Sequence, residues 1–285
     1  MKKTILVVAN QTLSGAKLLE KVIERAAEGE ARFVAVVPQN RPHSGLVIYD
    51  EAVRDAAQVR VDLAVDYMRQ RSIEAFGEVG DPDPFTAVMD AVAEHNPSEI
   101  ILSTLPASTS GWLRRDLVER VEQASGLPVE HIVIDLEHDR PLFTVTLVVA
   151  ARTAGGHELH DRLLARRNDE REHLFIVVVP LASKDGAAAS RARGQLRGLL
   201  RELKDDGLVA EGMVGDPDPY SAVMNALQFF RLDEIVISTF AGQRSGWLRA
   251  NLIERVKDAS RLPVEHVEAE SETASTPAGA GRASS

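Results

Sequence analysis

The chain has 285 residues, of which 44% are hydrophobic and 27% are charged, a composition typical of soluble globular proteins and long enough for about two domains. Its 33 Lys and Arg residues against 43 Asp and Glu residues give a net charge of −10. This acidic balance argues against general binding to nucleic acid or to anionic lipid, because both need a basic face. The absence of cysteine excludes disulfide frameworks, iron–sulfur clusters, thiolate zinc sites and cysteine nucleophiles.

The longest apolar segments of the chain are short. Val145–Ala151 and Ile176–Ala182 cannot span a bilayer, and the run Ile5–Ala9 after the first lysines is shorter than the core of a secretory signal. We interpret Ile5–Ala9 as part of a first buried strand. We therefore expect a cytoplasmic protein without membrane insertion.

Apolar runs alternate with stretches of helical periodicity along the chain. The first runs are Thr4–Ala9, Phe33–Pro38, Ile73–Glu78, Ile100–Ser103 and Val129–Ile134. Helical stretches lie between them at about 14–28, 50–71, 84–95 and 112–125. Similar apolar runs follow near 143–151, 173–180, 208–214, 235–239 and 264–268. Nearly continuous apolar runs indicate strands buried on both faces, and hence a mostly parallel sheet. The alternation predicts a doubly wound α/β fold, with ligands at the carboxyl ends of the strands.

An internal repeat divides the chain. The Gly-Asp-Pro-Asp-Pro segment Gly80–Pro84 recurs as Gly215–Pro219, 135 residues later, and the same spacing relates Ser110–Arg114 to Ser245–Arg249. Two copies of one domain explain these matches. We place the domains and connecting segments as follows: first domain 1–136, linker 137–142, second domain 143–268, and a disordered tail at 269–285 that lacks large apolar residues.

The repeated Gly-Asp-Pro-Asp-Pro segment has a local structural role. Gly80 permits a sharp exit from the third strand, Asp83 can cap the next helix, and Pro84 suits the first helical position. The same roles apply to Gly215 in the second copy. An exposed turn at the end of a strand also offers contacts to a ligand, so both interpretations stay open for Gly80 and Gly215.

Each half resembles a universal stress protein domain. The resemblance rests on the opening Ile-Leu-Val-Val strand, the Gly-Asp-Pro before the third helix and the Glu-Ile-Ile-Leu-Ser-Thr strand at 99–104, together with the Glu-Arg-Val helix and the closing Leu-Pro-Val strand. It implies a five-stranded parallel sheet with helices on both faces in each of two tandem, Rossmann-like domains. It also implies an intramolecular pseudo-dimer with Val129–Ile134 beside Val264–Glu268, and a role in the stress response.

The chain departs from the motif of the ATP-binding members that this resemblance brings to mind. Those members carry an Asp after the first strand, where this chain has Asn10 and Ala151, and glycines after the fourth strand. Other residues stand at the first two glycines and at the final Gly-Ser/Thr pair of that motif: Leu102, Leu105 and Arg115-Asp116 in the first copy, and Ile237, Phe240 and Ala250-Asn251 in the second. Because glycines let backbone amides approach phosphates, we expect no ATP binding of the family type and name no cofactor.

The loop after the fourth strand carries other candidate ligand groups in both copies. Hydroxyls, free amides and an Arg near a helix start suit a small anion. These candidates, together with Asn10 and the two strand-end glycines, are Ser103, Thr104, Ser110, Gly111 and Arg114 in the first copy and Ser238, Thr239, Ser245, Gly246 and Arg249 in the second. The alternative is that Ser110 and Ser245 cap helices starting near Trp112 and Trp247, with the tryptophans packed across the domain.

Histidines offer little further chemistry. His131 and His266 recur in the fifth strands, where a pseudo-dimer would bring them together, but they lack acidic or thiolate partners in the sequence. His157–His160 lacks the metalloprotease spacing and indicates a solvated helix start. We name no metal site and no catalytic residue.

Three functions remain as hypotheses. The first is a non-catalytic universal stress-type sensor or scaffold that binds a protein partner or self-associates, with a small anion as a possible ligand. The second is an adenine-nucleotide binder with slow ATP hydrolysis, which the family suggests and the lost glycines oppose. The third is a regulatory partner of a transporter.

Overall fold

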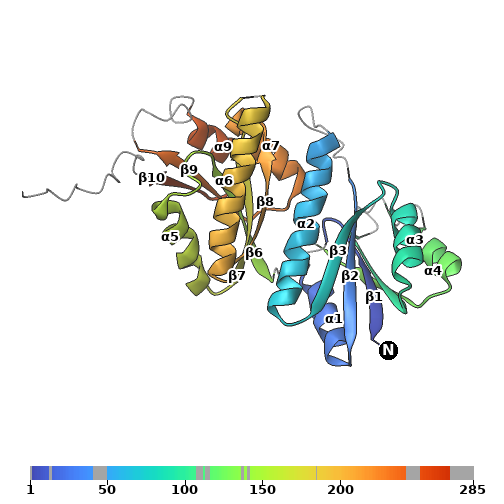
Figure 1. Ribbon diagram of the computed structural model, residues 1–285. Coiled ribbons are helices and arrows are strands. Elements are labelled where there is room, and N and C mark those ends of the chain that lie inside the picture. The colour runs from blue at the N-terminus through green and yellow to red at the C-terminus, as the bar shows by residue number, and fades with distance from the viewer. Residues whose placement is uncertain are drawn as a thin grey trace, which may run out of the picture.

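The computed structural model describes most of the chain, namely residues 2–12, 15–40, 50–106, 112, 116–135, 138–139, 142–183, 185–241 and 251–269. These residues form two five-stranded sheets in which all strand pairs are parallel. The first sheet has the order β3-β2-β1-β4-β5, and the second has the order β10-β9-β6-β7-β8, which is the same sequence of strands read from the opposite edge. The predicted tandem, doubly wound α/β fold is confirmed (Figure 1).

The strands form where the apolar runs predicted them. The first sheet contains β1 (Lys3–Val8), β2 (Ala31–Pro38), β3 (Glu74–Gly80), β4 (Glu99–Thr104) and β5 (Val129–Val133). The second contains β6 (Phe143–Ala150), β7 (Glu172–Pro180), β8 (Val209–Gly215), β9 (Glu234–Phe240) and β10 (Val264–Ala269). Burial on both faces explains the unbroken apolar runs, since consecutive residues Ile5 to Val8 are all at most 1% exposed. Ala269, which we placed in the tail, is the last residue of β10.

Helices lie on both faces of each sheet. Those of the first half are α1 (Ala16–Ala27), α2 (Asp50–Gln70), α3 (Pro84–His95) and α4 (Leu117–Ser125). Those of the second are α5 (His157–Ala165), α6 (Gly186–Asp205), α7 (Pro219–Phe229) and α9 (Leu252–Ser260), with the 3₁₀ turn η2 (Arg166–Asn168) after α5. In the described parts of the chain, no helix combines the length and the apolar character needed to cross a bilayer.

The helix expected over 112–125 begins later than predicted. α4 starts at Leu117, and Asp116 before it has a left-handed backbone with φ of 49° and makes no side-chain cap. The second half repeats this arrangement with Asn251 at φ 52° before α9. Asp and Asn tolerate this conformation better than most residues, so a turn precedes the helix in both halves.

In each half, an arginine forms ion pairs with two glutamates at the amino ends of the strands. Arg166 donates from Nε to Glu234 Oε1 and from Nη2 to Glu265 Oε2, both at 2.7 Å. In the first half Arg25 contacts Glu130 at 2.7 Å and Glu99 at 3.5 Å. Each arginine therefore joins a helix to the fourth and fifth strands of its own sheet. A planar guanidinium with several donors suits this bridging position.

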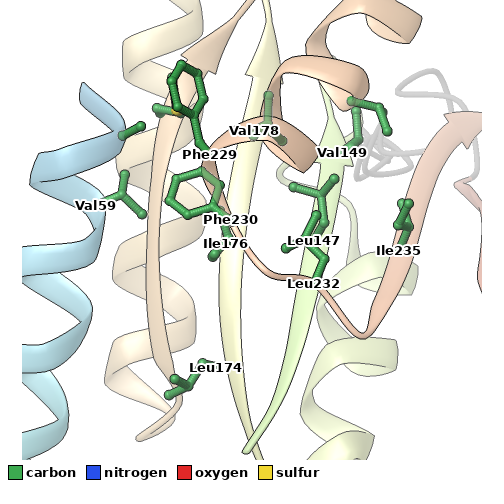
Figure 2. Packing of buried hydrophobic residues seen from close by; sticks show 14 of the residues in the cluster. Val59, Leu147, Val149, Leu174, Ile176, Val178, Phe229, Phe230, Leu232 and Ile235 are labelled. Atoms are coloured by element: carbon green, nitrogen blue, oxygen red, sulfur yellow. The ribbon is translucent and has the colours of Figure 1, made fainter. Parts of the chain in front are cut away.

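Helix α2 joins the two halves, because both of its sides are buried. One side covers the first sheet with Ala57, Val61, Ala64, Val65 and Met68. The opposite side lies in the core of the second half and contributes Val53, Ala56, Val59, Leu63 and Tyr67. Figure 1 shows α2 between the two sheets, and Figure 2 shows Val59 beside Phe229 and Phe230 of the second half. A helix with an apolar stripe on each of two opposite sides can pack into two cores at once, and α2 does so here.

A buried arginine also crosses the boundary between the halves. Arg60 of α2 is 8% exposed, and its Nη2 donates to the carbonyl oxygen of Phe229 at 2.5 Å. Phe229 is the last residue of α7, so the guanidinium lies at the negative end of that helix. Burial lowers the pKa of Arg60 to about 10, and the group therefore keeps its charge at neutral pH.

The expected pairing of the two fifth strands is wrong. β5 pairs with β4 and β10 pairs with β9, and each is an edge strand of a different sheet in the described residues. The halves meet instead through α2, which contacts β8 as well as β2 and β3 of its own sheet. The physical reason is the second apolar side of α2, which is covered only when the sheet of the second half packs against it.

Candidate functional site

The carboxyl ends of neighbouring central strands form the candidate site in each half. In a doubly wound sheet, ligands bind at the point where the strand order reverses, which here lies between β1 and β4 and between β6 and β9. Val8 pairs with Leu102 across the first of these points, so Asn10, shortly after β1, lies at the level of Thr104, the last residue of β4. The structure thus brings the predicted residues Asn10, Ser103 and Thr104 together.

Polar atoms without partners mark this site in the first half. Asn10 donates from Nδ2 to the Pro38 carbonyl oxygen at 3.3 Å, but its buried Oδ1 has no hydrogen-bond partner among the described residues. The hydroxyl of Ser103, a residue only 1% exposed, also has none. Leaving a buried polar atom unpaired costs about 1–3 kcal/mol, so such atoms indicate a bound water or a small polar ligand.

The second half repeats part of this arrangement. The hydroxyl of Ser238 is buried without a hydrogen-bond partner, as in Ser103. Ala151 follows β6 where Asn10 follows β1, and it offers no side-chain amide. The two halves therefore present the same serine but different neighbours.

Two threonines that we did not predict complete the strand ends. Thr12 donates from Oγ1 to the Ser103 carbonyl oxygen at 3.3 Å, and Thr153 donates to that of Ser238 at 3.0 Å. Both are buried, with 2% and 3% exposure. The sequence carried a signal for them, because Thr12 and Thr153 are separated by the same 141 residues that relate Leu6 to Leu147.

The recurring histidines each contact a threonine near the carboxyl end of the neighbouring strand. Thr104 Oγ1 lies 2.9 Å from His131 Nε2, and Thr239 Oγ1 lies 2.8 Å from His266 Nε2. Burial lowers the pKa of His131, which favours the neutral ring. The expected meeting of His131 with His266 is wrong, since they lie on edge strands of separate sheets. Their role is to satisfy the threonine hydroxyls at the strand ends.

The Gly-Asp-Pro-Asp-Pro turns have the predicted structural role. Asp83 accepts a hydrogen bond from the Thr86 backbone nitrogen at 3.0 Å, and Asp218 accepts one from Ser221 at 2.9 Å. A proline begins the helix in both copies. These contacts confirm the cap and the first helical position.

The glycines of these turns are required by close packing. A Cβ added to Gly80 would lie 2.6 Å from Cβ of Ala87 in α3, and one added to Gly215 would lie 2.9 Å from Cβ of Ala222 in α7 and 2.6 Å from Cγ1 of Val178 in β7. All three distances are shorter than van der Waals contact. The glycines therefore let α3 and α7 approach their strands, in addition to permitting the turn.

A repeated cation–π contact explains another part of the repeat. The guanidinium of Arg120 lies 4.2 Å from the ring centroid of Phe85, and that of Arg255 lies 4.1 Å from the centroid of Tyr220. The aromatic residue follows the turn, and the arginine belongs to the Glu-Arg-Val helix. These two parts of the repeat therefore form the same contact between neighbouring helices in each half.

Several predicted ligand residues lie outside the described residues. They are Ser110, Gly111, Arg114, Ser245, Gly246 and Arg249. Of the same loops, Trp112 is described, and it packs partly buried against the cluster of α3 and α4. The anion-binding interpretation of these loops stays a prediction.

One group of described side chains has the composition of a metal site. Ligand atoms of Glu78, Glu94 and His95 lie within 4.8 Å of one another, and His95 Nε2 is 3.2 Å from Glu78 Oε2. The corresponding residues of the second half are Met213, Phe229 and Phe230, which pack in the core that α2 completes. The polar trio therefore stands at the positions whose counterparts in the second half are apolar and pack in the core that includes α2.

His160 of α5 has a structural partner. The helix begins at His157, as the sequence indicated, and His160 Nε2 lies 2.7 Å from Asp206 Oδ2. This contact ties the start of α5 to the end of α6.

Solved universal stress proteins are structurally similar to this chain. A family member from Burkholderia pseudomallei covers 46% of this chain and 95% of its own, with 21% identity and a TM-score of 0.35. One from Archaeoglobus fulgidus covers 93% and 96%, with 18% identity and a TM-score of 0.35. An Arabidopsis thaliana family protein with AMP bound covers 47% and 94%, with 13% identity and a TM-score of 0.33. No protein-family model and no curated protein matches the sequence. Similarities at this level assign neither an activity nor a ligand.

Proposed function

We propose that the chain is a non-catalytic protein of the universal stress type, a sensor or scaffold for the stress response whose two halves act as one unit. The observation that carries this proposal is the sharing of α2 by both cores, with Leu63 and Tyr67 in one and Val61 and Met68 in the other. A change that moves α2 in the first half must repack the second, because protein cores are close-packed.

The candidate sites support binding rather than catalysis. The hydroxyl-bearing residues at the strand ends, Ser103, Thr104, Ser238 and Thr239, are at most 3% exposed. Neither serine hydroxyl has a hydrogen-bond partner among the described residues, so no general base there activates it as a nucleophile. The unpartnered atoms of Asn10 and the two serines are suited to a small polar ligand whose binding the halves could sense.

The edge strands supply a surface for a protein partner or for self-association. β5 and β10 each pair on one side only in the described part of the chain. Val133 at the end of β5 is 39% exposed, which is unusual for an apolar strand residue. An unpaired edge offers backbone donors and acceptors to a strand of another chain.

Adenine-nucleotide binding is the second candidate function. The unpartnered Oδ1 of Asn10 and hydroxyls of Ser103 and Ser238 favour it, since they lie where doubly wound folds receive nucleotides. Leu102, which we aligned with a lost glycine, opposes it. This leucine is fully buried in the core and cannot open a path for phosphates.

Thermal unfolding with a panel of ligands separates the two functions. The panel contains ATP with magnesium, ADP, AMP, cyclic nucleotides, phosphate and sulfate. A ligand present at a hundred times its dissociation constant adds about 2.7 kcal/mol to the free energy of unfolding, which raises Tm by roughly 5–10 °C. We expect no nucleotide-selective rise.

The matched variants Ser103→Ala and Ser238→Ala complete this experiment. An ATP-selective rise in Tm that is lost in either variant would replace the scaffold proposal by nucleotide binding at that half. Without such a rise, sedimentation of the chain alone and with cell extract tests self-association and partner binding. The scaffold proposal is contradicted if the chain sediments strictly as a monomer and no protein of the extract sediments with it.

A further inference from the structure

A cavity of about 270 Å³ lies where the two halves meet, beside the turn of Gly215 and apart from the strand-end serines and threonines described above. It opens at the carboxyl ends of β7 and β8, between α6 and α7, and the first turns of α2 form its remaining wall. Because α2 belongs to the first half, the cavity exists only when the halves are docked.

The inner surface of the cavity is apolar. Val178, Met213, Ala222 and Phe229 line it, and all four are at most 7% exposed. Val178 and Phe229 lie on neighbouring elements in Figure 2. A surface of this kind favours a ligand with a hydrocarbon body.

The polar lining of the cavity is acidic. Among the described lining residues, Glu51, Asp55 and Asp216 carry carboxylates, and Arg193 is the one cation. Arg193 already contacts Glu51, at 3.3 Å between Nη2 and Oε1. Asp55 and Asp216 therefore leave an excess of negative charge that a cationic ligand would neutralise.

Two groups of the lining also lack a hydrogen-bond partner within the described residues. Asp55 makes no hydrogen bond or ion pair there, and burial, with Glu51 and against the charges of Arg193 and Arg54, raises the pKa of its carboxyl. Asn225, also in the lining, has an Oδ1 that is buried without a hydrogen-bond partner. Both groups accept hydrogen bonds, so the ligand must donate them.

We propose that this cavity between the halves binds a small organic amine, with its ammonium group at Asp55 and Asp216 and its hydrocarbon body against Met213 and Phe229. An apolar cavity of 150 Å³ holds benzene, so the present volume suits a ligand of about ten non-hydrogen atoms. The proposal goes beyond the function proposed above, because it concerns a different site and a different class of ligand.

The internal repeat supplies a matched control for the site. Asp81 in the first half and Asp216 in the second occupy the same turn, and each accepts a hydrogen bond from the backbone nitrogen two residues later, at 2.8 and 2.9 Å. Only Asp216 lines the cavity. Replacing either residue thus has the same local structural effect, and only one replacement removes a ligand contact.

The test uses 2-phenylethylamine as the probe, and 3-phenylpropionate as a probe with a similar body and the opposite charge. Titration calorimetry on the full chain measures both, for the wild type, Asp55→Asn, Asp216→Asn and Asp81→Asn. We expect the amine alone to bind, with a dissociation constant below about 1 mM. We expect Asp55→Asn and Asp216→Asn each to weaken binding about tenfold, and Asp81→Asn to leave it unchanged.

Ala226→Phe provides an independent test, because it fills the cavity without removing a charge. We expect it to abolish amine binding while the circular dichroism spectrum stays that of the wild type. If this variant does not fold, the charge variants alone decide. The proposal is overturned if the amine does not bind, if the carboxylate binds equally well, or if Asp216→Asn and Asp81→Asn behave alike.

Discussion

Glu211 makes the boundary between the two halves sensitive to pH. This residue of β8 is 9% exposed, and Lys204 of α6 contacts both Glu211 and Asp66 of α2. Asp62 of α2 adds a third carboxylate, so one lysine faces three acids. Burial, together with Asp62 and Asp66 and against the effect of Lys204, raises the pKa of Glu211 to about 7.

The sign and size of the effect follow from this pKa. The folded protein holds the Glu211 proton more tightly than the unfolded chain, whose value is 4.5. The stabilisation is therefore complete below about pH 4.5 and is lost as the pH rises through 7. The rise in the pKa of Glu211 corresponds to a change of at most about 3 kcal/mol in the free energy of unfolding, which is roughly 5–10 °C in Tm for a chain of this size.

The variant Glu211→Gln tests this reasoning, because glutamine mimics the protonated carboxyl at every pH. We expect its free energy of unfolding to match that of the wild type near pH 5 and to exceed it by about 1–3 kcal/mol near pH 8. Urea unfolding followed by circular dichroism at both pH values measures the difference. Glu74→Gln is the control, since Glu74 is exposed on β3. Parallel pH profiles for the wild type and Glu211→Gln would refute the argument.

Three further predictions concern the packing that the fold depends on. Leu63→Ala shortens a side chain of α2 that lies in the second core, so it should lower the free energy of unfolding by about 2–4 kcal/mol and separate the unfolding of the two halves in calorimetry. Ile23→Ala, at an exposed position, should have neither effect. Gly215→Ala should lower the free energy of unfolding, measured by urea titration, by about 1–3 kcal/mol, because its Cβ would lie 2.6 Å from Val178. Gly194→Ala, which has open space around it in α6, should leave this free energy unchanged or raise it. Asp218→Ala should cost about 1 kcal/mol through the lost cap of α7, and an unchanged urea midpoint would contradict this role.

The candidate site was predictable in part. The sequence indicated the strand ends, so Asn10 and Ser103 could be named, and the repeat pointed to Ser238. It did not reveal that Thr12 and Thr153 bond to the serine carbonyls, because hydrogen-bond partners far apart in sequence depend on the register of neighbouring strands. The cavity beside Asp55 was also invisible, since its walls come from both halves.

The sequence by itself determined the local structure of this protein. Apolar runs specified the buried strands, and the Gly-Asp-Pro-Asp-Pro turns specified how α3 and α7 begin, because these features depend on residues close in the chain. The 135-residue repeat further showed that one such domain occurs twice.

Only the tertiary structure decided how the two domains meet. Duplicated helices α2 and α6 differ on their outer sides: Ala56, Val59, Leu63 and Tyr67 in α2 correspond to Arg191, Gly194, Gly198 and Glu202 in α6. The apolar side of α2 showed that something must cover it, but not which surface does. Burial of apolar area has no direction, so the partner is set by the shape and exposure of the second sheet, and α2 docks there instead of β5 pairing with β10.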